Sequence, residues 1–95
     1  MIDKIDYKIK ILLKQRDSPS VIKSPELRAS ICTLIEKAYF LESVILSNRT
    51  FSERIDNQFF TAKAAINRHY RDWGLDEVAD IYNELCEIAE PYLSN

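Results

Sequence analysis

Apolar residues between Thr50 and Trp73 recur at every third or fourth position, which is the period of one face of an α-helix. Thr50 and Glu53 have the spacing of a capping box, in which each side chain accepts a hydrogen bond from the backbone N–H of the other residue. The pattern therefore predicts a long amphipathic helix over residues 51–73. Its apolar stripe consists of Phe51, Ile55, Phe59, Ala62, Ile66, Tyr70 and Trp73.

A second amphipathic helix is predicted over residues 76–90, directly after the only glycine of the chain. Gly74 stands where a left-handed residue ends a helix, and glycine adopts that conformation without steric cost. Asp76 is a suitable N-cap for the following helix, and Pro91 disfavours helical geometry at the residue before it. One face of this helix is apolar, and the opposite face carries the carboxylates of Asp76, Glu77, Asp80, Glu84 and Glu87.

Two more helices are predicted in the first half of the chain, over residues 2–16 and 25–47. Residues 17–24 read as a loop, and Ser24 and Pro25 suit the N-cap and first position of the second of these helices. Residues 38–46 are apolar on nearly every side, which is typical of a helix that lies centrally in a core or faces a second subunit. In the second case the contact would consist of Tyr39, Phe40 and Val44, together with Tyr7 and Ile11 of the helix at 2–16.

Length and composition indicate one globular domain spanning residues 1–95. With 46% hydrophobic and 29% charged residues, the chain has enough apolar side chains for a packed core and is not of the disordered class. We therefore expect an all-α domain, a small four-helix bundle that could form a dimer, because a core of this size gains from association.

The charges are divided unevenly along the chain. Residues 1–71 contain all 13 basic residues and 8 acidic ones, a net charge of +5, whereas residues 72–95 contain seven carboxylates and no basic residue. The predicted helix at 2–16 is basic and the helix at 76–90 is acidic. Such asymmetry concerns association with other molecules rather than the fold, so it directs attention to the acidic helix as a contact surface.

Chemistry that would indicate an enzyme or a cofactor protein is lacking. The cysteines, Cys32 and Cys86, form no CxxC motif, and His69 is the only histidine, so neither a metal site nor a cofactor is expected. A lone histidine without a neighbouring nucleophile does not make a catalytic site. No apolar run approaches the ~20 residues of a membrane span, and the chain starts without a signal-peptide pattern, so a cytoplasmic location is expected.

The predicted contact surface combines the acidic helix with the basic and aromatic end of the helix before it. Arg68, Arg71 and Trp73 are residue types that dominate protein interfaces, although Trp73 also belongs to the apolar stripe. With the acidic residues Asp76, Glu77, Asp80, Glu84 and Glu87 they would bind a basic partner protein. Acidic residues at the start of this helix argue against a DNA-reading role, because a recognition helix needs basic or amide side chains there.

The expected function is that of a non-enzymatic protein-binding module. Small helical immunity proteins and inhibitors share this size, helical class and acidity, so an inhibitor, immunity or regulatory protein is the leading hypothesis. One alternative is a homodimeric structural or regulatory protein. Another is a weak nucleic-acid binder that uses the basic helix at 2–16, whose binding would weaken steeply with salt.

Overall fold

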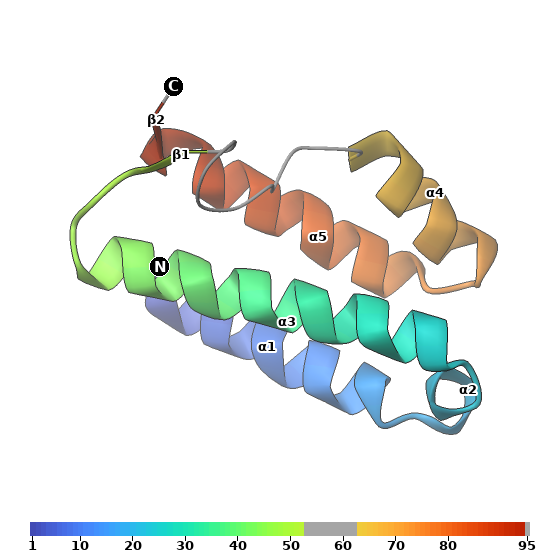
Figure 1. The fold of residues 1–95 in the computed structure, drawn as a ribbon. Helices are drawn as coiled ribbons and strands as arrows, with labels where there is room; N and C mark the ends of the chain where they lie inside the picture. The colour runs from blue at the N-terminus through green and yellow to red at the C-terminus, as the bar shows by residue number, and fades with distance from the viewer. Residues whose placement is uncertain (53–62, 95) are drawn as a thin grey trace. The chain divides into compact units, whose positions relative to one another are not determined.

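The computed structural model describes residues 1–52 and 63–94, and these residues form a mostly helical fold (Figure 1). Four described helices have seven or more residues: α1 (Ile2–Arg16), α3 (Pro25–Leu46), α4 (Lys63–Asp72) and α5 (Asp76–Ala89). The shorter elements are α2 (Pro19–Ile22), the 3₁₀ helix η1 (Glu90–Tyr92) and the strands β1 (Phe51–Ser52) and β2 (Leu93–Ser94). The predicted all-α class with four longer helices is confirmed.

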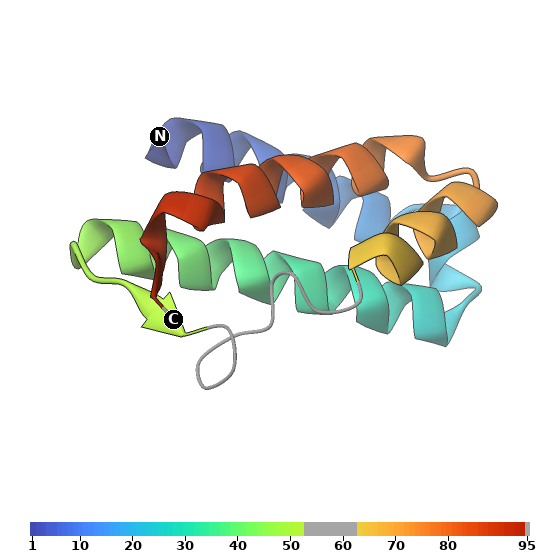
Figure 2. The same cartoon turned by 90° about the horizontal axis from the view of Figure 1, so that it is seen from above.

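Contacts divide the chain into two compact units, Met1–Glu42 and Ser43–Asn95. In the first unit α1 and α3 run antiparallel and are joined through α2, as both views show (Figures 1 and 2). One face of each helix is buried, because apolar residues recur at the helical period. The buried residues of this unit are Ile5, Ile9, Leu12, Val21, Leu27, Ile31, Leu34, Ile35, Ala38 and Leu41.

The first unit follows the sequence prediction closely at its helix boundaries. α1 has the predicted bounds, and α3 ends one residue earlier than expected. The Ser24 hydroxyl oxygen accepts a hydrogen bond from the Leu27 backbone N–H at 3.3 Å, as an N-cap does. The expected loop at 17–24 instead contains the short helix α2, because Pro19 suits a first helical position and the Ser18 carbonyl accepts the first hydrogen bonds.

Two helices end in the same backbone motif, at Asn48 and at Gly74. Both residues have positive φ, 52° and 74°. After α4, the Leu75 N–H donates to the Tyr70 carbonyl at 2.8 Å and the Gly74 N–H donates to the Arg71 carbonyl at 3.0 Å. This pair of bonds satisfies carbonyls that the helix leaves unpaired, and it needs a left-handed residue. The predicted role of Gly74 is confirmed, and Asn48 ends α3 in the same way.

The helix predicted over residues 51–73 is wrong at its N-terminal end. Phe51 and Ser52 form β1, which pairs in parallel with β2 in the register Phe51–Leu93, so Thr50 does not cap a helix. The Ser94 hydroxyl also donates to the Phe51 carbonyl at 3.0 Å. Phe51 is buried as its place in the apolar stripe predicted, but it reaches the core from a strand. Glu53, Ile55, Phe59 and Ala62 lie outside the described residues, and the described helix begins at Lys63.

Glu42 on α3 has an unusual carboxyl group. Burial raises its pKa most, and a hydrogen bond to Asp6 and the charge of that residue raise it further, to about 7 from an ordinary value of 4.5. The folded protein therefore holds a proton that the unfolded chain releases between these two values. The stability that the protonated form provides is fully present below the unfolded pKa and is lost as the pH rises through the folded pKa.

Glutamine carries no charge at either pH, so replacing Glu42 with glutamine should remove this loss of stability. The free energy of unfolding should rise by about 1 kcal/mol at about pH 8 and stay almost unchanged at about pH 4. Solvent screening at this half-buried site keeps the gain small. Urea unfolding followed by circular dichroism at both pH values measures the difference. Glu36→Gln, an exposed change on the same helix, is the control and should show no such pH dependence. An effect of Glu42→Gln that is equal at both pH values would contradict the prediction.

Candidate protein-binding surface

The predicted contact residues lie on α4, on α5 and in the turn between these helices. α5 divides sharply into two faces. Seven of its residues are buried: Val78, Ala79, Ile81, Tyr82, Leu85, Cys86 and Ala89. Its five carboxylate residues are all exposed: Asp76, Glu77, Asp80, Glu84 and Glu87. The helical period of the sequence thus produces a helix with one buried apolar face and one exposed acidic face, as predicted.

The remaining predicted contact residues, Arg68, Arg71 and Trp73, are also exposed. Trp73 is 55% exposed, whereas Tyr70 on the same predicted stripe is 1% exposed. The reason is local, because α4 ends at Asp72 and the backbone turns at Gly74, which carries the indole off the buried face. The prediction that Trp73 belongs to the core is wrong. Its exposed indole can instead contact another molecule.

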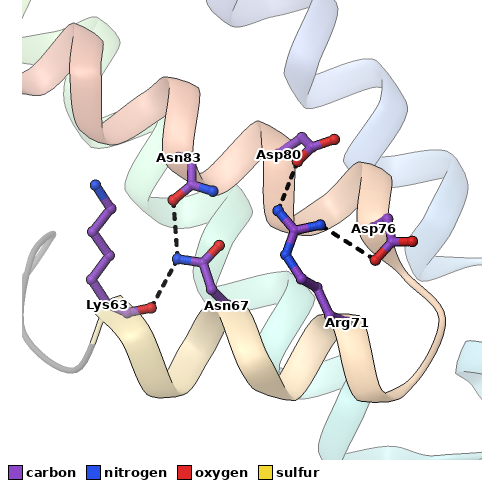
Figure 3. A network of polar contacts seen from close by, with 6 residues as sticks. All are labelled: Lys63, Asn67, Arg71, Asp76, Asp80 and Asn83. Atoms are coloured by element: carbon purple, nitrogen blue, oxygen red, sulfur yellow. Dashed lines mark hydrogen bonds and ion pairs between the residues drawn. The ribbon is translucent and has the colours of Figure 1, made fainter.

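Arg71 binds two carboxylates of its own chain (Figure 3). Its Nη2 lies 2.9 Å from Asp80 Oδ1 and its Nη1 lies 3.3 Å from Asp76 Oδ1, so one guanidinium joins α4 to two successive turns of α5. The hydrogen bond that Arg71 donates to Asp80, followed by the contacts with Asp76, raises the pKa of Arg71 above its ordinary value. We call Arg71, Asp76 and Asp80 the Arg71 clamp. Its net charge is −1, because two carboxylates share one cation.

The clamp also explains why Asp76 does not cap α5 as predicted. The N-cap position is occupied by Leu75, and Asp76 is the first residue of the helix. Its carboxylate faces the Arg71 guanidinium instead of a backbone N–H of the first turn. A carboxylate in the first turn still interacts favourably with the positive end of the helix dipole, so the acidic start of α5 remains suited to a helix.

A second polar contact between α4 and α5 was not predicted from the sequence. Asn67 Nδ2 donates to Asn83 Oδ1 at 3.0 Å and to the Lys63 carbonyl at 2.9 Å (Figure 3). Asn67 Oδ1 is buried and accepts no hydrogen bond, which carries an energetic cost. The amide side chain of Asn67, between Ile66 and Tyr70 in the sequence, was a possible signal of this contact. The spacing of residues along α4 does not, however, identify which residue of α5 lies opposite.

His69, Cys32 and Cys86 are the remaining candidate residues. His69 is exposed, and its ring centroid lies 5.6 Å from that of Tyr70 in a tilted arrangement. Cys32 is half-buried, Cys86 is buried, and neither cysteine forms a disulfide. None of the helices in residues 1–52 and 63–94 is long and apolar enough to cross a membrane. The exposed acidic face of α5 gathers five carboxylate residues on one helix.

Comparisons with protein-family models, with curated proteins and with solved structures find no match to this chain. The structure defines the class of the protein as all-α, with four longer helices among the described residues. Its function has to be inferred from the surface of α4 and α5.

Proposed function

We propose that this protein is a non-enzymatic binding module, an inhibitor, immunity or regulatory protein that contacts a basic partner protein through α5. The observation that carries the proposal is that all five carboxylate residues of α5 are exposed, whereas seven residues on its other face are buried. No basic residue interrupts this acidic face within α5. A row of like charges attracts a partner of opposite charge and speeds its association.

Trp73 supports the proposal because it provides an exposed aromatic side chain next to the acidic face. It lies in the turn that contains Gly74, three residues before α5 begins, and is 55% exposed. Tryptophan is enriched among the residues that contribute most to protein interfaces, since its large ring buries much area with few rotatable bonds. The proposed surface therefore combines charge, which steers association, with one aromatic contact that would slow dissociation.

Glu84→Lys combined with Glu87→Lys should weaken partner binding by about ten- to a hundredfold, because like charges placed opposite each other across an interface are strongly unfavourable. These two positions leave the Arg71 clamp intact. The partner is first isolated at low salt with the N-terminally tagged protein and identified by mass spectrometry. The affinity of the purified pair is then measured by isothermal titration calorimetry.

The matched control is Glu26→Lys combined with Glu36→Lys on α3, where both side chains are exposed. It makes the same change in net charge and should leave the affinity within about twofold, since neither residue belongs to the proposed contact surface. Circular dichroism confirms that both double variants remain helical. Equal affinities of the wild-type protein and the α5 variant would refute the assignment of this surface.

A homodimer is the second candidate, favoured by two exposed aromatic residues in the first unit. Tyr7 on α1 is 66% exposed and Tyr39 on α3 is 52% exposed. Val44, which the sequence placed on the dimer surface, is fully buried and cannot contribute. If the isolation returns only this chain, at a mass near twice 11.1 kDa, the homodimer would replace the partner-binding proposal. Nucleic acid without protein in the eluate would point to the basic α1 instead.

A further inference from the structure

α4 buries fewer side chains than α5. All ten residues of α4 are described, and one of them, Tyr70, is buried. α5, with 14 residues, buries seven. Burial of apolar side chains is the main source of stability for a docked helix. A helix with one buried side chain therefore belongs to the part of a structure that opens most readily.

Polar contacts near the surface join α4 to α5. The Arg71 side chain is 44% exposed, and its partners Asp76 and Asp80 are 70% and 60% exposed. Ion pairs at such exposure are weakened by dissolved salt. The Asn67–Asn83 hydrogen bond is less exposed, but the unpaired Asn67 Oδ1 offsets part of its contribution. Among the contacts of the described residues, docking of α4 thus involves the burial of Tyr70 and a clamp whose strength varies with ionic strength.

The turn between the helices is suited to motion. Gly74 has φ of 74°, and no atom lies within 4 Å of the position that a Cβ would occupy. Glycine has more accessible backbone conformations than any other residue, so the chain can change direction at this point at lower steric cost than at another residue type. Hinges of moving elements are commonly a few residues of this kind at the end of a helix.

We propose that α4 docks reversibly on α5 by turning about Gly74, and that the Arg71 clamp controls how often it opens. In the open state α4 exposes Tyr70 and releases the carboxylates of Asp76 and Asp80, while α5 stays folded. Lower ionic strength favours the docked state, since the attraction between Arg71 and the two carboxylates is then stronger. This inference stands independently of the proposed binding function.

Hydrogen exchange of the full chain, followed by mass spectrometry or NMR, tests the proposal directly. The backbone amides of α4 should exchange faster than those of α5. Raising the salt concentration from about 0.02 M to about 0.5 M should accelerate exchange in α4 by about two- to tenfold and leave α5 unchanged. Arg71→Gln should produce a similar acceleration at low salt and remove most of the further effect of salt.

The control is Arg68→Gln, which removes an exposed arginine from the same helix without touching the clamp. Its exchange rates should match those of the wild-type protein. The proposal fails if α4 and α5 exchange at the same rate, which would mean that they open together. It also fails if neither salt nor Arg71→Gln alters exchange in α4, or if salt accelerates this exchange and Arg71→Gln does not. The salt series uses the wild-type protein and stays decisive even if a variant folds poorly.

Discussion

Replacing Leu85 with alanine should lower the free energy of unfolding by about 2–5 kcal/mol, the range found when a fully buried leucine is truncated. Leu85 lies at the middle of the apolar face of α5 and is completely buried. The loss combines the transfer of fewer apolar atoms from water with the cavity that the missing atoms leave, because the surrounding side chains relax only in part. Urea unfolding of both proteins, followed by circular dichroism, measures the difference.

Glu87→Ala provides the control on the same helix. Glu87 is exposed, and alanine is a strong helix former, so the free energy of unfolding should change by less than about 0.5 kcal/mol. A Leu85→Ala loss as small as that of Glu87→Ala would show that this face of α5 is not packed in the folded protein. The comparison therefore tests the separation into a buried and an exposed face on which the functional proposal depends.

Helices whose boundaries are set by local residues could be predicted from the sequence. The period of apolar side chains gave α1 and α5, Ser24 and Pro25 gave the start of α3, and Gly74 gave the end of α4. Each of these signals acts within one or two turns of the chain, through capping hydrogen bonds or backbone conformation. The exposed acidic face of α5 was predictable for the same reason.

Features that depend on distant residues could not be predicted. Phe51 continues the apolar period of a helix, but its backbone pairs with Leu93 at the other end of the unit. Two residues in a strand leave no alternating pattern to detect, whereas helical spacing was plainly present. The Arg71 clamp was missed likewise, because the turn at Gly74 determines which α5 carboxylates reach the guanidinium. Interactions between elements need the three-dimensional path of the chain.

Truncation of Tyr70 and truncation of Trp73 should change the stability of the protein by very different amounts. Tyr70→Ala should lower the free energy of unfolding by about 3 kcal/mol, whereas Trp73→Ala should change it by less than about 0.5 kcal/mol. Tyr70 is the single buried side chain of α4, and its removal leaves a cavity and loosens the helix. The Trp73 indole projects from the turn after α4 and is largely in contact with solvent, so its loss leaves the packing unchanged.

Urea unfolding of the two variants, monitored by circular dichroism because Trp73 is the only tryptophan, measures both changes. Binding to the isolated partner should show the opposite order. Trp73→Ala should weaken binding by about tenfold, as expected for an aromatic residue at the edge of a charged contact surface. Equal losses of stability would mean that both rings belong to one apolar stripe, as the sequence period alone implied. A stable Trp73→Ala variant with unchanged affinity would confine the contact surface to the carboxylates of α5.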